Sequence, residues 1–178
     1  MSLMLMPTLL RITTSLLLAC LLAACVSQPR QTAAVATFIV VRHAEKATDD
    51  PRDPALTQAG RVRADRLATS LASLPLRAVY ATAFKRTQQT AEPSAHAHAV
   101  AVITYDAKQP ISEFGARLKG THLVGTILVV GHSNTVPDIA AVLCSCEVPS
   151  MADTEYDRRM TIRVAPNGAA NLTITRDR

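Results

Sequence analysis

The sequence is poor in aromatic residues: its 178 residues include no Trp, three Tyr and three Phe. Proteins that bind single-stranded nucleic acid stack bases on aromatic side chains, so this shortage disfavours that function. Lys and Arg total 19 against 14 Asp and Glu, but the positive charges are spread along the chain and form no basic block. A nucleic-acid partner is therefore not expected.

Long apolar runs are also missing, and the longest one lies near the N-terminus. The run from Leu16 to Val26 would reach only about 16 Å as a helix, against roughly 30 Å for the hydrocarbon core of a membrane. It follows a single positive charge, Arg11, and contains the small residues Ala23 and Ala24. This arrangement is typical of a secretory signal peptide rather than of a membrane span.

The end of this run, Leu22-Ala23-Ala24-Cys25, resembles the lipobox of bacterial lipoproteins. The resemblance implies a signal peptide over residues 1–24, a lipidated Cys25 that anchors the protein to a membrane, and a tether over residues 25–36. An ordinary export signal with a coincidental Cys25 is the alternative. The folded domain is expected over residues 37–178, and either interpretation places it outside the cytoplasm.

The residue after the lipobox bears on which membrane holds the anchor. Val26 stands where many lipoproteins of the inner membrane have Asp. By this resemblance we expect an exported lipoprotein on the periplasmic face of the outer membrane.

Cysteine is scarce as well, with four residues in the chain. Cys20 would leave with the signal peptide and Cys25 would carry lipid, so only Cys144 and Cys146 stay in the domain. A disulfide across one intervening residue closes a strained ring, so two thiols at the end of a helix are the favoured interpretation. Formation of the disulfide is the alternative, because the expected compartment is oxidising. No second Cys/His pair stands at ligand spacing, so no metal is expected.

Two apolar runs without polar alternation, at 38–41 and 127–130, predict strands buried on both faces of a sheet. Between them, Thr57 is a candidate N-cap for a helix with apolar residues at helical spacing from Ala64 to Leu74. Further helices are predicted over 86–91, 111–123 and 136–143, and further strands over 78–80, 100–104, 159–164 and 171–175. This order predicts an α/β fold, a three-layer α/β/α sandwich with a mainly parallel central sheet.

Both buried runs end in a histidine, as Arg42-His43 and Gly131-His132, and Arg86 begins a helix after a third strand. Ligands of open α/β sheets bind beyond the carboxyl ends of the strands, so these side chains should converge. Two guanidinium groups suit a tetrahedral dianion such as phosphate. An imidazole between two permanent cations is held neutral, and a neutral imidazole can attack phosphorus.

Four motifs in order resemble those of the histidine phosphatase superfamily, the phosphoglycerate mutase-like family. They are Arg42-His43-Ala44-Glu45, Leu56-Thr57-Gln58-Ala59-Gly60, Arg86-Thr87-Gln88-Gln89-Thr90-Ala91 and Gly131-His132-Ser133-Asn134. The resemblance implies a phosphoglycerate mutase-like fold, a phosphohistidine intermediate on His43, phosphoryl binding by Arg42 and Arg86, and a hydrogen bond to the phosphoryl oxygens from His132. No cofactor is implied.

The expected function is hydrolysis of a phosphomonoester or phosphohistidine, on a phosphorylated small molecule or a phosphoprotein. The mutases of the family carry a longer substrate loop after the first histidine, whereas here a short acidic segment, 44–55, stands in its place. The segment therefore favours a short phosphatase branch. A phosphate-binding lipoprotein without turnover, a phosphomutase and a metal-dependent hydrolase are the alternatives.

The general acid is not fixed by the motifs. Ser133 stands where the acid-phosphatase branch has Asp, and the resemblance to the mutase-like branch points to Glu113 as the proton donor. Glu113 can also be a surface residue that interacts with the positive end of a helix. Other candidates are Glu45, Asp49, Asp53, Glu155 and Asp157. If none donates, the substrate needs a good leaving group, such as a phosphohistidine or an acyl phosphate.

Other polar residues are given structural roles. His96 and His98 are expected to be exposed in a loop, and His122 to be solvated. Asn134 and Thr135 either make polar contacts in the turn of the second histidine or cap the helix that follows them, and capping is the favoured expectation. The third strand carries Thr82 where the family motif has Ser.

Overall fold

The computed structural model describes residues 35–177. The predicted signal peptide, lipidation at Cys25 and the tether up to residue 34 lie outside these residues. Within the described part of the chain, no helix is long and apolar enough to cross a membrane.

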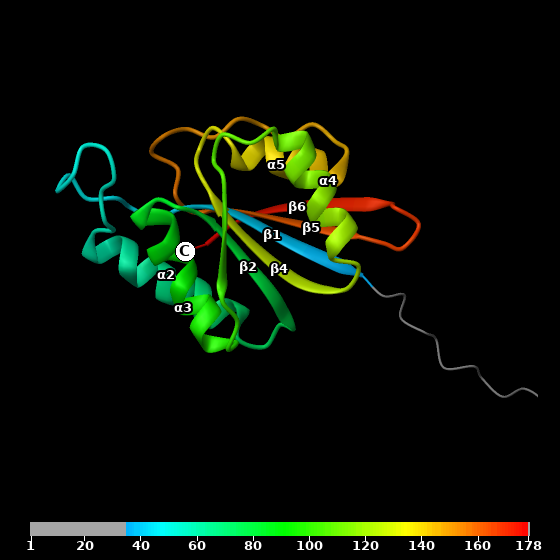
Figure 1. Cartoon of the computed structure of the whole chain (residues 1–178), viewed down its shortest axis with the longest axis horizontal. Helices are drawn as coiled ribbons and strands as arrows, with labels where there is room; N and C mark the ends of the chain where they lie inside the picture. The colour runs from blue at the N-terminus through cyan, green and yellow to red at the C-terminus, as the bar shows by residue number, and fades with distance from the viewer. Residues whose placement is uncertain (1–34, 178) are drawn as a thin grey trace, which may run out of the picture. The chain divides into compact units, whose positions relative to one another are not determined.

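A six-stranded sheet with the order β3-β2-β4-β1-β5-β6 forms the centre of the domain (Figure 1). The strands are β1 (Ala36–Arg42), β2 (Leu76–Thr82), β3 (Val102–Tyr105), β4 (Gly125–Gly131), β5 (Arg158–Val164) and β6 (Ala170–Arg176). The strands β3, β2, β4 and β1 are parallel, whereas β5 and β6 add an antiparallel edge. The mainly parallel sheet predicted from the sequence is confirmed.

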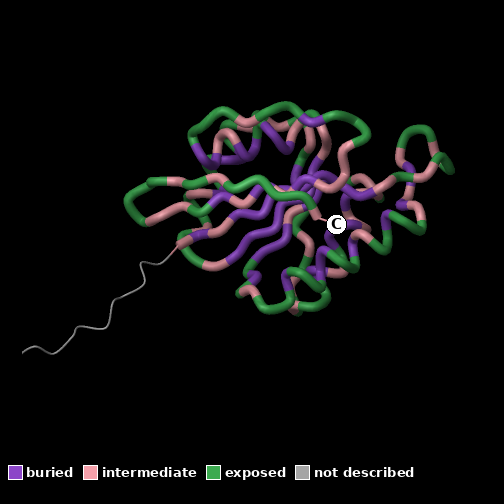
Figure 2. The backbone as a smooth tube through the Cα atoms, turned by 180° about the vertical axis from the view of Figure 1, so that it is seen from behind, coloured by how far each residue is buried: buried purple, intermediate pink, exposed green. Residues whose placement is uncertain are grey.

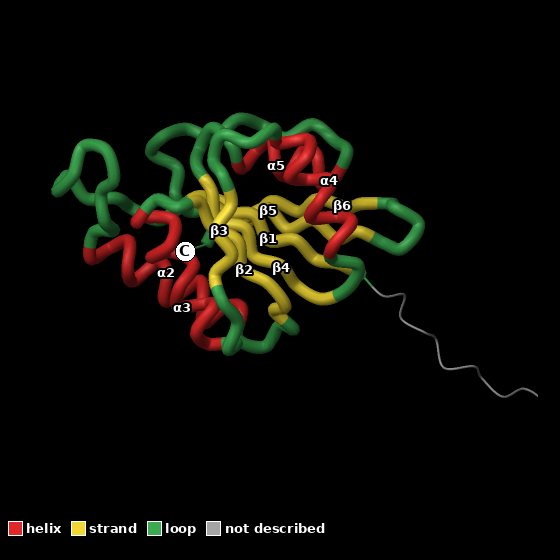
Figure 3. Tube along the Cα trace, in the orientation of Figure 1, coloured by secondary structure: helices red, strands yellow, loops and turns green. Residues whose placement is uncertain are grey.

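The two central strands are buried because helices cover both faces of the sheet. Phe38 and Val40 of β1 pack on one face with residues of α4 (Ile111–Thr121) and α5 (Val136–Cys144). Ile39 and Val41 pack on the other face with residues of α2 (Gln58–Leu71) and α3 (Lys85–Ala97). Figure 3 shows the two helical layers on either side of the strands, and Figure 2 shows the buried strands between more exposed loops. The predicted three-layer sandwich is confirmed.

The register of the central strands brings the two predicted site histidines together. Arg42 at the end of β1 pairs with Gly131 at the end of β4. The backbone N–H of His43 then donates to the backbone oxygen of Gly131 at 2.9 Å. His43 and His132 therefore leave the sheet from adjacent strand ends, as the carboxyl-edge argument requires.

The first helix begins as its sequence predicts, whereas the helix containing Pro93 is longer than predicted. The Thr57 side chain accepts a hydrogen bond from the N–H of Gly60 and caps α2. The sequence predicted that the second helix ends at Ala91, but α3 continues through Pro93 to Ala97. His96 is exposed as predicted, but it belongs to this helix rather than to a loop.

The remaining two histidines make contacts that the sequence did not predict. Nδ1 of His98 lies 2.9 Å from the backbone oxygen of Ser94, and the residue is only partly exposed. Nε2 of His122 lies 2.9 Å from the hydroxyl of Tyr80. The expectation that both are simply solvated is wrong, because each packs against the end of its own helix or a neighbouring strand.

Cys144 and Cys146 are joined by a disulfide, so the interpretation as two thiols is wrong. Helix α5 ends at Ser145, whose backbone is left-handed with φ 54° and ψ 41°. This turn brings the two Cα atoms to 5.2 Å, within the usual range for a disulfide. The disulfide was not predicted because its closure depends on the left-handed backbone of Ser145, which no sequence pattern indicates.

Candidate active site

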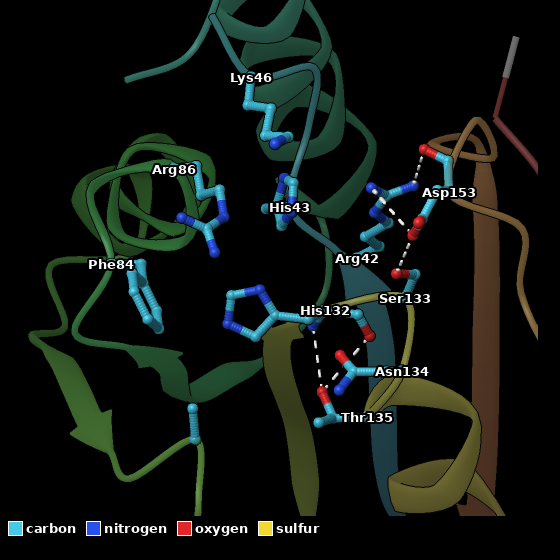
Figure 4. Close-up of a pocket in the computed structure, with 11 residues that line it drawn as sticks. Arg42, His43, Lys46, Phe84, Arg86, His132, Ser133, Asn134, Thr135 and Asp153 are labelled. Atoms are coloured by element: carbon cyan, nitrogen blue, oxygen red, sulfur yellow. Dashed lines mark hydrogen bonds and ion pairs between the residues drawn. The ribbon is translucent and has the colours of Figure 1, made fainter. Parts of the chain in front are cut away.

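A pocket of about 480 Å³ lies at the carboxyl edge of the parallel strands. It is lined by the four predicted site residues Arg42, His43, Arg86 and His132. Figure 4 shows His43 between the guanidinium groups of Arg86 and Arg42, with His132 beside them. The pocket is lined by Arg42, His43, Lys46, Phe84, Arg86, Ala107, His132, Ser133, Asn134, Thr135 and Asp153. The predicted convergence of two histidines and two arginines is therefore present.

His43 is buried and its ring is fixed by the backbone. Its Nδ1 lies 2.8 Å from the backbone oxygen of Ala44. A carbonyl oxygen only accepts, so Nδ1 carries the proton and donates it. The lone pair of the neutral ring is therefore on Nε2, which is the nitrogen available as a nucleophile.

The charge state of His43 follows from its surroundings. The pKa of His43 is lowered to about 3, mainly by burial and in smaller part by the charges of Arg42, His132 and Arg86, against a hydrogen bond to Ala44 that raises it. The neutral form predominates at physiological pH because a third positive charge in this position is disfavoured. The sequence argument identified the two arginines, but burial is the larger cause.

Arg42 is held by the loop that joins α5 to β5. Its Nη1 donates to the backbone oxygens of Ala152, Asp153 and Glu155 at 3.3, 2.7 and 3.3 Å. The ring of Tyr156 covers the guanidinium group, 4.1 Å from its central carbon. These backbone oxygens carry no net charge and orient the cation, whereas its one carboxylate contact among the described residues, from Nη2 to Asp153 Oδ1, is long at 4.0 Å.

Arg86 lies in the first turn of α3 and faces Arg42 across His43. The ring of Phe84 stacks on its guanidinium group at 4.3 Å, and Asp53 Oδ1 lies 3.9 Å from Nη1. Burial lowers the pKa of Arg86. Nε of Arg42 and Nε of Arg86 are buried without a hydrogen-bond partner among the described residues. Two cations with incomplete hydrogen bonding favour the binding of an anion.

His132 is linked to a chain of two threonine hydroxyls. Thr87 Oγ1 donates its one hydrogen to a backbone oxygen, that of Phe84 at 2.7 Å or Thr82 at 2.9 Å. Thr82 Oγ1 therefore donates to Thr87 Oγ1 at 2.8 Å and accepts from His132 Nε2 at 3.0 Å. The chain fixes the proton of neutral His132 on Nε2.

Burial lowers the pKa of His132 to about 4, and Arg86 and Arg42 contribute in the same direction. Because Nε2 already donates to Thr82, His132 can donate to a bound phosphate from Nδ1 only after it takes up a proton. The negative charge of a phosphate dianion would favour that uptake. The role of His132 as a donor to the phosphoryl oxygens stays a prediction.

Thr135 does not cap α5 through its side chain, so the favoured expectation is wrong, and the alternative, a polar contact in the turn of the second histidine, is the one observed. Its Oγ1 instead accepts from the backbone N–H of His132 at 3.1 Å. Thr135 and Asn134 both line the pocket. The Thr135 hydroxyl therefore stabilises the turn of the second histidine and makes no capping hydrogen bond to α5.

The candidate proton donors are not gathered at the pocket. Glu113 is exposed in the first turn of α4 and is not among the pocket residues in the described part of the chain. Its role as proton donor stays a prediction without structural support. Glu45 pairs with Arg63 at 2.7 Å, and Asp49 accepts from the N–H of Ala55.

The remaining candidates are also committed to other partners. Asp53 accepts from the N–H of Lys85 at 2.9 Å, which leaves it beside Arg86. Glu155 pairs with Arg158 and Arg176, and Asp157 pairs with Arg176, each at 2.8 Å. These carboxylates therefore hold loops rather than face the pocket.

Four further residues line the pocket and were not predicted as site residues: Lys46, Phe84, Ala107 and Asp153. Phe84 and Lys46 lie close in sequence to motif residues, and this proximity was an available signal. Asp153 carries no such signal, because it lies on a loop twenty positions after Ser133. Among residues 35–177, no cluster of three His, Cys, Asp or Glu residues that could hold a metal ion is found.

Comparisons with known proteins concern the family and the fold. A family model described as the histidine phosphatase superfamily (branch 1) matches residues 38–112, which include three of the four motifs. A search of curated proteins finds no match.

Solved structures share the fold at low sequence identity. The protein histidine phosphatase SixA complexed with tungstate is 18% identical, with 79% of this chain and 96% of that chain covered and a TM-score of 0.62. A mycobacterial glucosyl-3-phosphoglycerate phosphatase is 12% identical over 81% of this chain and 100% of that chain, with a TM-score of 0.64. Phosphoserine phosphatase from Entamoeba histolytica is 17% identical over 80% and 98%, with a TM-score of 0.58.

Proposed function

We propose that this chain is a member of the histidine phosphatase superfamily, whose model matches residues 38–112, and that it is a phosphohydrolase that forms a covalent phosphohistidine on His43. The observation that carries the proposal is the state of His43. Its ring is neutral, its Nε2 holds the lone pair, and two guanidinium groups flank it. A nucleophile, and cations that neutralise the equatorial oxygens of a transferring phosphoryl group, are what phosphoryl transfer requires.

In the first step, Nε2 of His43 attacks phosphorus and the bond from phosphorus to the leaving group breaks. The leaving group departs with the electron pair, and Arg42 and Arg86 bind the phosphoryl oxygens. In the second step, the oxygen of a water molecule attacks phosphorus, and the electron pair of the P–N bond returns to Nε2. Phosphate then leaves the pocket.

The leaving group is expected to be a good one. The proton donor proposed from the sequence, Glu113, does not line the pocket, and a positioned acid contributes about 10²–10⁴-fold when the leaving group is a poor one. A phosphohistidine, an acyl phosphate or an aryl phosphate departs without such help. We therefore favour activated phosphoryl donors, carried by a small molecule or a protein, over alkyl phosphates.

The test is to label the protein with radioactive acetyl phosphate and quench the reaction in alkali. Wild-type protein should carry an alkali-stable, acid-labile label and should release phosphate into water. His43→Ala should carry none, and the exposed His96→Ala, as the matched control, should label like wild type. Equal labelling of His43→Ala would overturn the proposal, and label that is never released would identify a binding protein without turnover.

The same experiment reports the charge of His43. An ordinary histidine with a pKa of about 6.5 is roughly three-quarters protonated at pH 6, so its labelling rate would fall about fourfold between pH 8 and pH 6. Because the pKa of His43 is lowered to about 3, its neutral fraction stays near one over this range. The initial labelling rate should therefore differ by less than twofold between the two pH values.

We further propose that the protein is an exported lipoprotein attached to the membrane at Cys25. The support is the sequence Leu22-Ala23-Ala24-Cys25 after a short apolar run. In this compartment the substrate would be an extracytoplasmic phosphoryl compound.

A further inference from the structure

Asp153 is the one carboxylate that lines the pocket among the described residues. It lies on the loop between α5 and β5, outside the four sequence motifs. Its charge is close enough to the site for Arg42 and His43 to act on its ionisation. A carboxylate beside a phosphoryl-transfer site has a chemical use only if its position and its protonation state suit one of the two steps.

The position of Asp153 is set by both main-chain and side-chain contacts. Arg42 Nη1 donates to the backbone oxygen of Asp153 at 2.7 Å. The hydroxyl of Ser133, the residue after the second histidine, donates to Asp153 Oδ1 at 2.6 Å. Ser133 stands where the acid-phosphatase branch has Asp, and it cannot itself act as an acid. Its hydroxyl instead orients the carboxylate of Asp153.

The second oxygen of Asp153 is accessible to water, because the side chain is 91% exposed. The carboxylate is ionised at neutral pH, since the hydrogen bond from Ser133 and the charge of Arg42 both lower the pKa of Asp153. An ionised carboxylate accepts a proton but has none to give. This state suits the hydrolysis of the phosphoenzyme, in which water must lose a proton, and not the departure of the leaving group.

We propose that Asp153 is the general base of the second step, a role that rests on the proposed phosphohistidine mechanism. The oxygen of a water molecule forms a bond to phosphorus, and one of its protons passes to Oδ2 of Asp153. The P–N bond breaks and its electron pair returns to Nε2 of His43. Asp153 then releases the proton to solvent, so the carboxylate is regenerated for the next turnover. Ser133 is a positioning residue, because its hydrogen bond to Oδ1 restricts the orientation of the carboxylate at the pocket.

Rapid-mixing kinetics with an activated aryl phosphate separate the two steps, because the phenol appears in the first and phosphate in the second. In Asp153→Asn, the burst of phenol should keep the wild-type rate, with about one phenol released per protein. The following steady state should fall about 10²–10⁴-fold, the usual contribution of a positioned base. Label on His43 should accumulate to nearly every molecule.

Asp65→Asn is the matched control, because Asp65 is an exposed carboxylate on α2 that does not line the pocket. It should behave like wild type in both phases. Ser133→Ala should lengthen the life of the phosphoenzyme by a smaller factor, since the carboxylate remains but is less well oriented. In Asp153→Ala, added formate should restore part of the dephosphorylation rate, which a purely structural role of Asp153 would not allow.

The outcomes distinguish this inference from the proposed function. If wild-type protein forms no phosphohistidine, the proposed function fails. If wild type is labelled and Asp153→Asn loses its label at the same rate, Asp153 is not the base. A burst slowed as much as the steady state would also overturn the inference, because it would place Asp153 in binding or in the first step.

Discussion

At the scale of single residues, the protonation of the two histidines is set by their hydrogen-bond acceptors. The backbone oxygen of Ala44 places the proton of His43 on Nδ1, and the hydroxyl of Thr82 places the proton of His132 on Nε2. The two rings therefore present different nitrogens to the pocket. Neither acceptor reacts with the substrate, but each determines which ring nitrogen of its histidine carries the proton.

We expect Thr82→Val to test the threonine chain. Thr82 is fully buried, so the change leaves the Nε2–H of His132 and the hydroxyl of Thr87 with a lost partner. The free energy of unfolding should fall by about 1–3 kcal/mol, the usual cost of an unsatisfied buried group. Urea unfolding measures this. Thr82→Ser keeps the hydroxyl and should lose clearly less, so equal losses in both variants would point to packing instead.

The four site residues that the sequence identified and the pocket contains share one property: each lies in a motif at a strand or helix end. Arg42, His43 and His132 are adjacent in space because neighbouring parallel strands end at one edge. Asp153 could not be found in this way, because its place depends on how the loop wraps around Arg42. The convergence is observed, and the catalytic roles stay predictions.

At the scale of elements, the loop between α5 and β5 is the part of the site with least regular structure, and Arg158 fixes it. The guanidinium group of Arg158 donates to the backbone oxygens of Pro149 and Ser150 at 2.8 and 3.0 Å, and pairs with Glu155 at 2.8 Å. Arg158 is only 9% exposed. The loop that orients Arg42 is thus itself held by a second buried arginine.

Replacing Arg158 by Met should therefore affect both stability and the site. Removal of one partner of a buried ion pair costs about 3–5 kcal/mol, and urea unfolding should show a loss in this range. Affinity for inorganic phosphate, measured by calorimetry, should fall at least tenfold because Arg42 loses its fixed orientation.

A variant without the disulfide is the control for the replacement of Arg158 by Met. The disulfide closes a very short ring, so Cys146→Ser should cost only about 1–2 kcal/mol, and phosphate affinity should stay within twofold of wild type. A tenfold loss of phosphate affinity in Cys146→Ser would show that the disulfide, rather than Arg158, orders the loop.

The existence and order of the elements could be predicted, whereas some of their ends could not. The runs at β1 and β4 predict buried strands because no polar residue interrupts them. The predicted helix ended at Ala91, whereas α3 continues through Pro93 to Ala97. Ala95, after the proline, is buried in the same core cluster as residues of the central strands, and this packing outweighs the low helix propensity of proline.

At the scale of the whole molecule, the proposed anchor can be tested in cells. Metabolic labelling with radioactive palmitate should mark the protein, and Cys25→Ser should abolish the label and release the protein from membranes. Cys20→Ser is the control and should keep both, because Cys20 would be removed with the signal peptide. Retention of the label in Cys25→Ser would refute lipidation at this position.

The direction of β1 determines which way the pocket points. The strand enters the domain at Ala36 and reaches the pocket only at Arg42, some 20 Å further on at the usual rise of a strand. The chain therefore enters the domain at the opposite end of β1 from the mouth of the pocket. A molecule immobilised by the chain ahead of Ala36, on a bead as well as on a bilayer, should remain open to phosphorylated proteins that approach from solution.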